Sequence, residues 1–134
     1  MAVTRTSLPT SISGGRTILY DSDADDTAET DVMGGATKVN IIVVDNSANA
    51  AQAEYLKIWD AKGPTVGTTA PDFIFLIPAA QVCIFEFEEE DSTGTISEYV
   101  TFATALSYAC VTTAGTAGTT SPTSDVKVWV VIAD

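Results

Sequence analysis

The residues best suited to chemistry in this chain form an acidic segment at positions 21–26, Asp-Ser-Asp-Ala-Asp-Asp. Asp21, Asp23 and Asp25 alternate along it, as acidic residues do at the start of a calcium-binding loop, where they supply hard oxygen ligands. Such a loop needs glycine at its sixth position and a bidentate glutamate at its twelfth, but this chain has aspartate and Val32 there. We therefore expect a solvated turn between two strands, with a calcium site at the three aspartates as the alternative hypothesis.

The chain contains few of the residue types and motifs that commonly support catalysis. The chain contains no histidine, so it lacks the commonest general base, the commonest metal ligand and the Ser–His and Cys–His pairs of many hydrolases. Neither G-x-G-x-x-G nor G-x-x-x-x-G-K-[ST] occurs, so no nucleotide-binding fingerprint is present. Carboxylates are plentiful, but a glycosidase needs two of them facing each other across a cleft, which sequence does not show. We expect no catalytic residue and no cofactor, and we predict that the protein is not an enzyme.

The two cysteines, Cys83 and Cys110, each lie within an apolar strand pattern and not in a C-x-x-C pair. Free cysteine is among the most buried residue types, so we predict two buried free thiols. A disulfide between them is the alternative if their strands pack face to face.

Length and composition predict one folded domain. The 134 residues suffice for a single core, and 46% of them are hydrophobic. The net charge of −12 disfavours binding to nucleic acid or to an anionic membrane, because such binding requires clustered Lys and Arg. Residues 1–15 contain no apolar core of signal-peptide length, and no run approaches the ~20 apolar residues that span a bilayer. We expect synthesis in a reducing cytoplasm.

The first 15 residues differ from the rest of the chain. They are polar, contain Pro9 and end in two glycines, which predicts an extended N-terminal arm before a single domain at residues 16–134. Strand-type patterns recur in that domain at residues 16–20, 28–33, 38–45, 53–59, 73–77, 81–88, 99–104, 106–112 and 125–132. A short helical turn near residues 49–57 is the one alternative to strand or loop that we consider in this domain. The expected fold is all-β, a single antiparallel β-sandwich of jelly-roll or immunoglobulin-like type.

Some strands show which face is buried. Residues 38–45 have β-branched side chains on both faces, which indicates a central strand. The continuous apolar run at 73–77 predicts a strand buried on both faces. In residues 81–88 we expect inward and outward positions to alternate, with Cys83, Phe85 and Phe87 inward and Glu86 and Glu88 outward.

Three further features have a structural and a functional interpretation. The acidic run at 86–91 is a solvated strand end or a charged contact surface, and the Thr/Gly/Ser-rich segment 112–124 is a long exposed loop. Trp59, Trp129 and Tyr108 fall in dense strand patterns, so we expect core or interface packing. If they were exposed, they would instead be able to stack on sugar rings.

Several motifs are shared with a known group of proteins. They are Tyr-Leu-Lys-Ile-Trp at 55–59, Pro-Thr-Val-Gly-Thr-Thr-Ala-Pro at 64–71, Ile-Pro-Ala at 77–79, and Phe-Ala-Thr-Ala-Leu-Ser-Tyr-Ala-Cys-Val-Thr-Thr-Ala-Gly-Thr-Ala-Gly-Thr-Thr at 102–120. In this order they resemble small β-rich virion structural proteins of tailed bacteriophages, over residues 37–133. The N-terminal third, including the acidic segment, has no counterpart, and the resemblance transfers no catalytic residue.

The resemblance implies a place in a phage particle. The favoured expectation is a capsid decoration, or cement, protein on the outer capsid surface of the virion, with the major capsid protein as its partner and a homo-oligomer, preferably a trimer, as its assembled state. One alternative is a head–tail connector, tail or fibre-associated subunit, and another is a glycan-binding module. We expect the arm and the loop at 62–71 to contact neighbouring subunits. The predicted assembly contacts are Thr4, Arg5, Leu8, Pro9, Ile12, Lys62, Pro64, Val66 and Pro71.

Overall fold

The computed structural model describes residues 3–7 and 16–133 of the chain, and in this part it contains strands and no helix. The strands are β1 (Thr4–Ser7), β2 (Thr17–Ala24), β3 (Thr37–Asp45), β4 (Glu54–Asp60), β5 (Phe73–Ile77), β6 (Val82–Glu86), β7 (Glu89–Glu90), β8 (Ile96–Ser97), β9 (Val100–Phe102), β10 (Leu106–Val111) and β11 (Val126–Ile132). The all-β prediction is confirmed, and eight of the nine predicted strand segments contain an observed strand.

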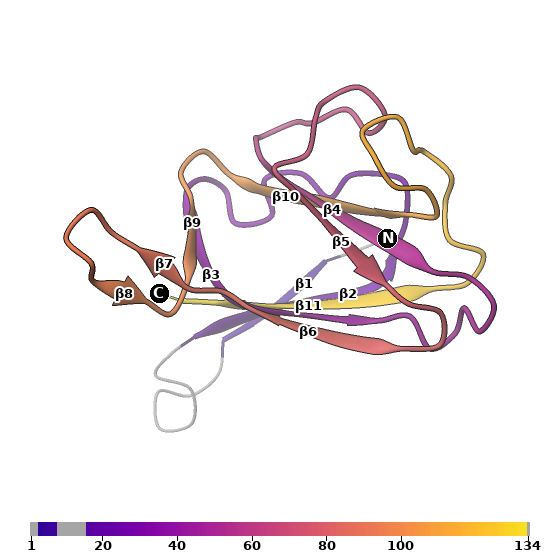
Figure 1. Ribbon diagram of the computed structural model, residues 1–134, viewed down its shortest axis with the longest axis horizontal. Helices are drawn as coiled ribbons and strands as arrows, with labels where there is room; N and C mark the ends of the chain where they lie inside the picture. Colours follow the sequence, from indigo (N-terminus) through magenta and orange to yellow (C-terminus); the bar gives the residue numbers. More distant parts are fainter. Residues whose placement is uncertain (1–2, 8–15, 134) are drawn as a thin grey trace.

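The strands form two layers (Figure 1). One layer is a six-stranded sheet in the order β1-β2-β11-β3-β6, with β9 also paired to β3, and the other is a three-stranded sheet in the order β10-β4-β5. All of these pairs are antiparallel. Strands β7 and β8 form a separate hairpin. The arrangement is the predicted antiparallel β-sandwich.

The core lies between the two sheets. Leu19 on β2, Val44 on β3 and Val130 on β11 point inward from the six-stranded sheet and meet Leu56 and Ile58 on β4. Their neighbours along each strand of the six-stranded sheet point outward, as the two-residue period of a strand requires. Burying one such side chain contributes about 1.5–3 kcal/mol to stability.

Aromatic side chains close one side of the sandwich, where β5 and β6 are edge strands of different sheets. The rings of Phe75 and Phe85 stack with centroids 4.4 Å apart, and the Phe87 ring packs against that of Phe75. The predicted inward positions in β6 are therefore confirmed. The prediction that β5 is buried on both faces is wrong: Ile74 is 38% and Leu76 52% exposed, because β5 lies at a sheet edge.

Two local predictions are also wrong, and one minor alternative is not observed. Residues 28–33 form no strand, because this segment makes a single bridge from Glu29 to Tyr108 and then turns at Asp31, whose φ is 46°. The solvated turn expected at 21–26 is replaced in its first half by strand, since β2 continues to Ala24. The region near 49–57 contains hydrogen-bonded turns and then β4, with no helix among the described residues.

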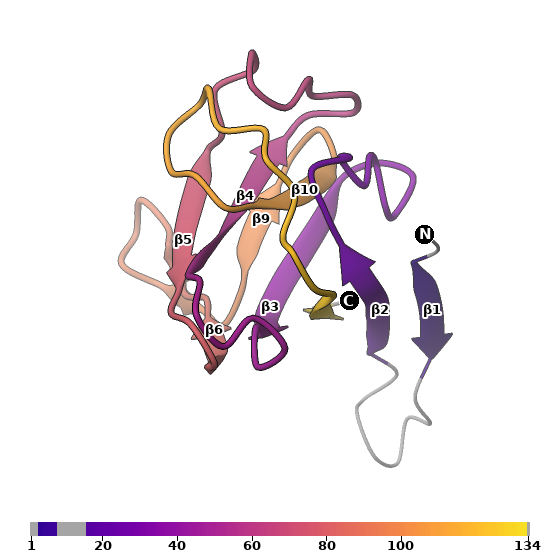
Figure 2. The same ribbon diagram turned by 90° about the vertical axis from the view of Figure 1, so that its right-hand side faces the viewer.

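The arm is partly a strand of the chain's own sheet. Thr4 to Ser7 form β1, which pairs with β2 from Tyr20 to Thr17 at the edge of the six-stranded sheet (Figure 2). Residues 8–15 lie outside the described part of the chain. Both cysteines are free, as predicted; Cys110 is buried and Cys83 is partly exposed.

Candidate interaction surface

The outer face of the three-stranded sheet is covered by the chain's own loops. Both loops follow strands of this sheet, at residues 61–72 after β4 and at 112–125 after β10, and Figure 1 shows them on its outer side. The Trp59 indole Nε1 donates to the Thr69 carbonyl at 3.0 Å. The Lys57 ammonium donates to the Gly118 carbonyl at 2.6 Å and to the Thr116 carbonyl at 3.3 Å. Both side chains are fully buried, so the loops form part of the folded core.

Two glycines let these loops pack closely. A Cβ atom at Gly67, whose φ is +87°, would overlap the Thr119 side chain of the other loop. A Cβ atom at Gly118 would overlap the Thr113 carbonyl within its own loop. Glycine is therefore required at both positions. The two motif-bearing loops of the sequence pack against each other and against the sheet.

The loop residues predicted as assembly contacts differ in exposure. Lys62 is exposed, Val66 and Pro71 are partly exposed, and Pro64 is buried within the chain. The evident role of this loop is to cover Trp59.

The predicted contacts in the arm are only partly described. Thr4 is exposed on β1, and the backbone of Arg5 lies opposite Leu19 in the sheet. Leu8, Pro9 and Ile12 lie outside the described residues.

The outer face of the six-stranded sheet is different, because it is mostly apolar and the described residues form no comparable cover over it. In register, Tyr20 on β2 lies opposite Trp129 on β11, Trp129 opposite Val43 on β3, and Val43 opposite Ile84 on β6. All of its apolar side chains are partly or largely exposed. We call this surface the apolar outer face; it consists of Ile18, Tyr20, Ile41, Val43, Val82, Ile84, Trp129 and Val131.

Aromatic and β-branched side chains dominate the centre of this face. The rings of Tyr20 and Trp129 are stacked with centroids 5.0 Å apart and an interplanar angle of 25°. Ile84 is 64% exposed at the edge of the sheet. A contiguous exposed apolar patch on a soluble chain marks a binding surface, and aromatic side chains are the usual anchors of protein interfaces.

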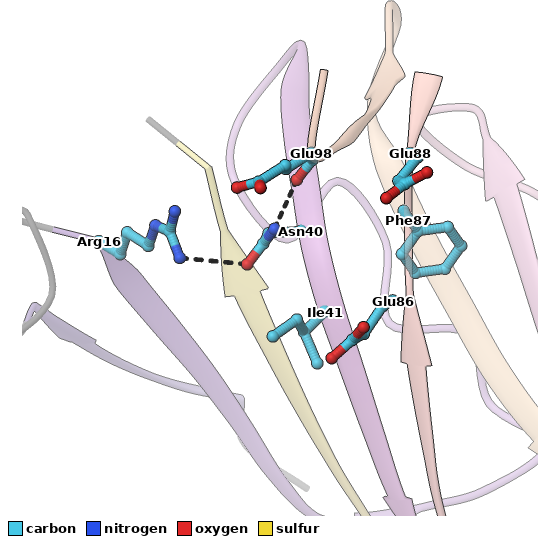
Figure 3. Close-up of a pocket in the computed structure, with 7 residues that line it drawn as sticks. All are labelled: Arg16, Asn40, Ile41, Glu86, Phe87, Glu88 and Glu98. Carbon is cyan, nitrogen blue, oxygen red and sulfur yellow. Dashed lines mark hydrogen bonds between the residues drawn. The ribbon is translucent and has the colours of Figure 1, made fainter. Parts of the chain in front are cut away.

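An acidic pocket borders the apolar outer face (Figure 3). Its volume is about 230 Å³, and it is lined by Arg16, Asn40, Ile41, Glu86, Phe87, Glu88 and Glu98. The Asn40 side chain accepts a hydrogen bond from Arg16 Nη1 at 3.2 Å and donates to the backbone carbonyl of Glu98. The lining thus contains three carboxylates and one guanidinium.

The three aspartates of the calcium hypothesis do not converge. Asp21 is buried, and its carboxylate accepts hydrogen bonds from the Tyr108 hydroxyl at 3.1 Å and the Asp23 amide at 3.2 Å. The Asp25 carboxylate accepts instead from the Thr27 amide at 2.7 Å. The described residues contain no group of three or more Asp, Glu or Cys side chains placed to hold a metal. Burial raises the pKa of Asp21, which is typical of a structural hydrogen-bonding role in the core.

Two other ionisable groups are buried on opposite faces of β4. Glu54 is fully buried, and neither of its carboxylate oxygens has a hydrogen-bond partner among the described residues. Burial raises the pKa of Glu54 to about 7 and lowers that of Lys57. Because residues 54 and 57 are three positions apart in a strand, they point to opposite faces and do not pair.

The buried thiol and phenol are also unsuited to chemistry. Burial, followed by the nearby carboxylates, raises the pKa of both Cys110 and Tyr108, so both groups stay protonated. Among the aromatic residues considered for sugar binding, Trp59 and Tyr108 are buried, and Trp129 is partly exposed in the apolar outer face. The described residues therefore offer a surface for binding.

Sequence reasoning did not identify the apolar outer face as a contact surface. The signal was present in β3, whose side chains are β-branched or aliphatic on both faces. In a two-layer sandwich only one face of a strand can be covered by the opposite sheet, so such a strand must expose the other face.

No family model matches the chain, and neither a curated protein nor a solved structure is similar enough to count as a match. Within the described residues no helix long and apolar enough to cross a membrane is present.

Proposed function

We propose that this chain is a structural protein of a tailed-bacteriophage virion and, more specifically, a capsid decoration protein. In this role it binds the outer surface of the assembled shell and stabilises it, with the major capsid protein as its partner. The sequence motifs between residues 37 and 133 support the phage assignment. The observation that supports an assembly role most strongly is the apolar outer face, with Tyr20, Trp129 and Ile84 partly or largely exposed on one side of the sheet.

The physical properties of the chain suit addition to a preformed shell. A net charge of −12 keeps the free protein soluble and repels packaged DNA. A rigid sheet loses little conformational entropy when it is covered, so most of the apolar burial contributes to binding. Binding to the assembled shell stabilises that shell, because a ligand shifts an equilibrium toward the state that it binds.

The assembled state that we favour is a homo-oligomer, preferably a trimer at three-fold positions of the lattice. A connector, tail or fibre-associated subunit is able to use the same apolar face, but at a different place in the particle.

Imaging of purified particles of the encoding phage tests this proposal. We expect density for the chain on the outside of the shell, and a copy number comparable to that of the major capsid protein. Density at the portal vertex or the tail would replace the decoration role with the connector or tail role. Absence of the chain from purified particles would overturn both.

A further inference from the structure

We propose that the apolar outer face and the acidic pocket at its border form one docking surface, and that this surface binds a protein partner of defined chemistry. That partner presents apolar side chains next to a lysine or arginine, and the cationic group enters the pocket. This inference rests on the proposed function, in which the partner is the capsid protein. It adds which surface of the chain binds that partner and which side chains of the partner this surface recognises.

The two parts of the surface are contiguous. Ile41 belongs to the apolar outer face and also lines the pocket. In register, Ile41 lies opposite Glu86, and Ile84 lies two positions before Glu86 on the same face of β6. A partner that covers Ile84 and Val43 is therefore within reach of the Glu86 carboxylate, which lies beside Ile41 in Figure 3.

The pocket lining carries more negative than positive charge. Three carboxylates, on Glu86, Glu88 and Glu98, face a single guanidinium, and this Arg16 group is already bonded to Asn40. Asn40 is buried and also holds the Glu98 backbone, which fixes one wall of the pocket. A cationic group of a partner would be attracted to these carboxylates, and desolvation of the pair by the surrounding apolar contact would strengthen that attraction.

A second copy of the chain is a poor source of that charge. Each copy has 6 Lys and Arg against 18 Asp and Glu; Lys57 is buried, and Lys127, which is exposed beside Trp129 on the same outer face, already lies opposite Asp45 in register. Two copies stacked through this face would bring together two chains of net charge −12. Charge complementarity therefore favours a cationic partner over self-association.

A matched pair of substitutions tests the apolar part. Ile84 lies on the apolar outer face and is 64% exposed, whereas Ile96 lies on the β7–β8 hairpin and is 62% exposed. Both are replaced by aspartate, and binding is measured by cosedimentation with shells of the encoding phage that lack this protein. We expect Ile84→Asp to weaken binding at least thirtyfold, the effect of losing an interface anchor, and Ile96→Asp to bind like wild type.

A second matched pair tests the pocket. Glu88→Lys reverses a charge in the pocket, whereas Glu90→Lys makes the same charge change on β7 outside its lining. We expect Glu88→Lys to weaken binding by about tenfold at low salt and to flatten the salt dependence that wild type shows. Glu90→Lys is expected to remain close to wild type.

The outcomes separate this inference from the proposed function. If wild type and Ile84→Asp bind the shells equally well, the docking surface is wrong and the decoration role stands. If wild type does not bind the shells, the decoration role fails and the inference fails with it. The mass of the free protein in solution is the remaining readout: a wild-type oligomer that Ile84→Asp dissociates would show that a second copy covers this face, and would overturn the cationic partner.

Discussion

The two outer faces of the sandwich differ in what covers them. The three-stranded sheet buries a lysine, Lys57, and a tryptophan, Trp59, beneath two loops that follow its own strands. The six-stranded sheet leaves Tyr20, Trp129 and Ile84 partly or largely exposed. The chain thus completes one face itself and leaves the other face apolar, which is the distribution expected when a partner supplies the second cover.

The largest effect that we predict concerns the covered face. Lys57→Met keeps the length of the side chain but leaves the buried carbonyls of Thr116 and Gly118 without their donor. We expect the free energy of unfolding to fall by about 3 kcal/mol in urea titrations. The matched control is Lys127→Met on the six-stranded sheet, where the side chain is exposed and a change within about 0.5 kcal/mol is expected. Equal losses in the two variants would mean that the two faces do not differ in this way.

The next effect is a pH dependence of stability, and it originates at the buried carboxyl group of Glu54 in the three-stranded sheet. Burial raises the pKa of Glu54 from 4.5 to about 7, so the folded state holds this proton more tightly than the unfolded state. Stability is therefore full below pH 4.5 and is lost as the pH rises through 7, by about 3 kcal/mol. Glu54→Gln removes the ionisation, and urea unfolding between pH 5 and pH 8 should show a much flatter profile than wild type. A wild-type stability that rises over this range would contradict the prediction.

At lower pH other carboxylates change the stability of the fold with pH in the opposite direction. Burial favours the neutral form of Asp60, but amide hydrogen bonds from residues 103–105 outweigh it and lower the pKa. Hydrogen bonds from Thr93, first from its hydroxyl, lower the pKa of Asp91. Their stabilising contributions are lost as the pH falls through these lowered values, so we expect maximum stability near about pH 5.

The smallest effect compares the two tryptophans directly. Trp59→Phe loses the hydrogen bond to Thr69 in a buried site and should cost about 1–2 kcal/mol, whereas Trp129→Phe on the apolar outer face should stay within about 0.5 kcal/mol. Each variant retains a single tryptophan. Acrylamide should quench the fluorescence of Trp129 more strongly than that of Trp59, and equal quenching would remove the contrast between the faces.

The strands were predictable because their signal is local. Residues 73–77 and 125–132 carry apolar or alternating patterns that specify a strand whatever lies around them, and both segments are strands in the structure. Residues 28–33 carry a much weaker apolar pattern, and the segment makes only the single bridge of Glu29 before it turns at Asp31.

The candidate surface was not predictable in the same way. A two-residue period shows that both faces of β3 are apolar, but not which of them the other sheet covers. The burial of Lys57 depends on carbonyls about 60 positions away in the sequence, and that of Asp21 depends on Tyr108 across the core. Such contacts are set by the assembled fold and leave no local pattern.

The orientation of the chain in the proposed assembly tests the central claim most directly. A reconstruction at a resolution that places side chains would show which face of the sandwich meets the neighbouring subunit. We predict that Trp129 and Ile84 are buried in that contact, that a lysine or arginine of the neighbour lies against Glu86 or Glu88, and that the loop at 61–72 faces solvent. An apolar outer face directed toward solvent, with the loops against the shell, would contradict it.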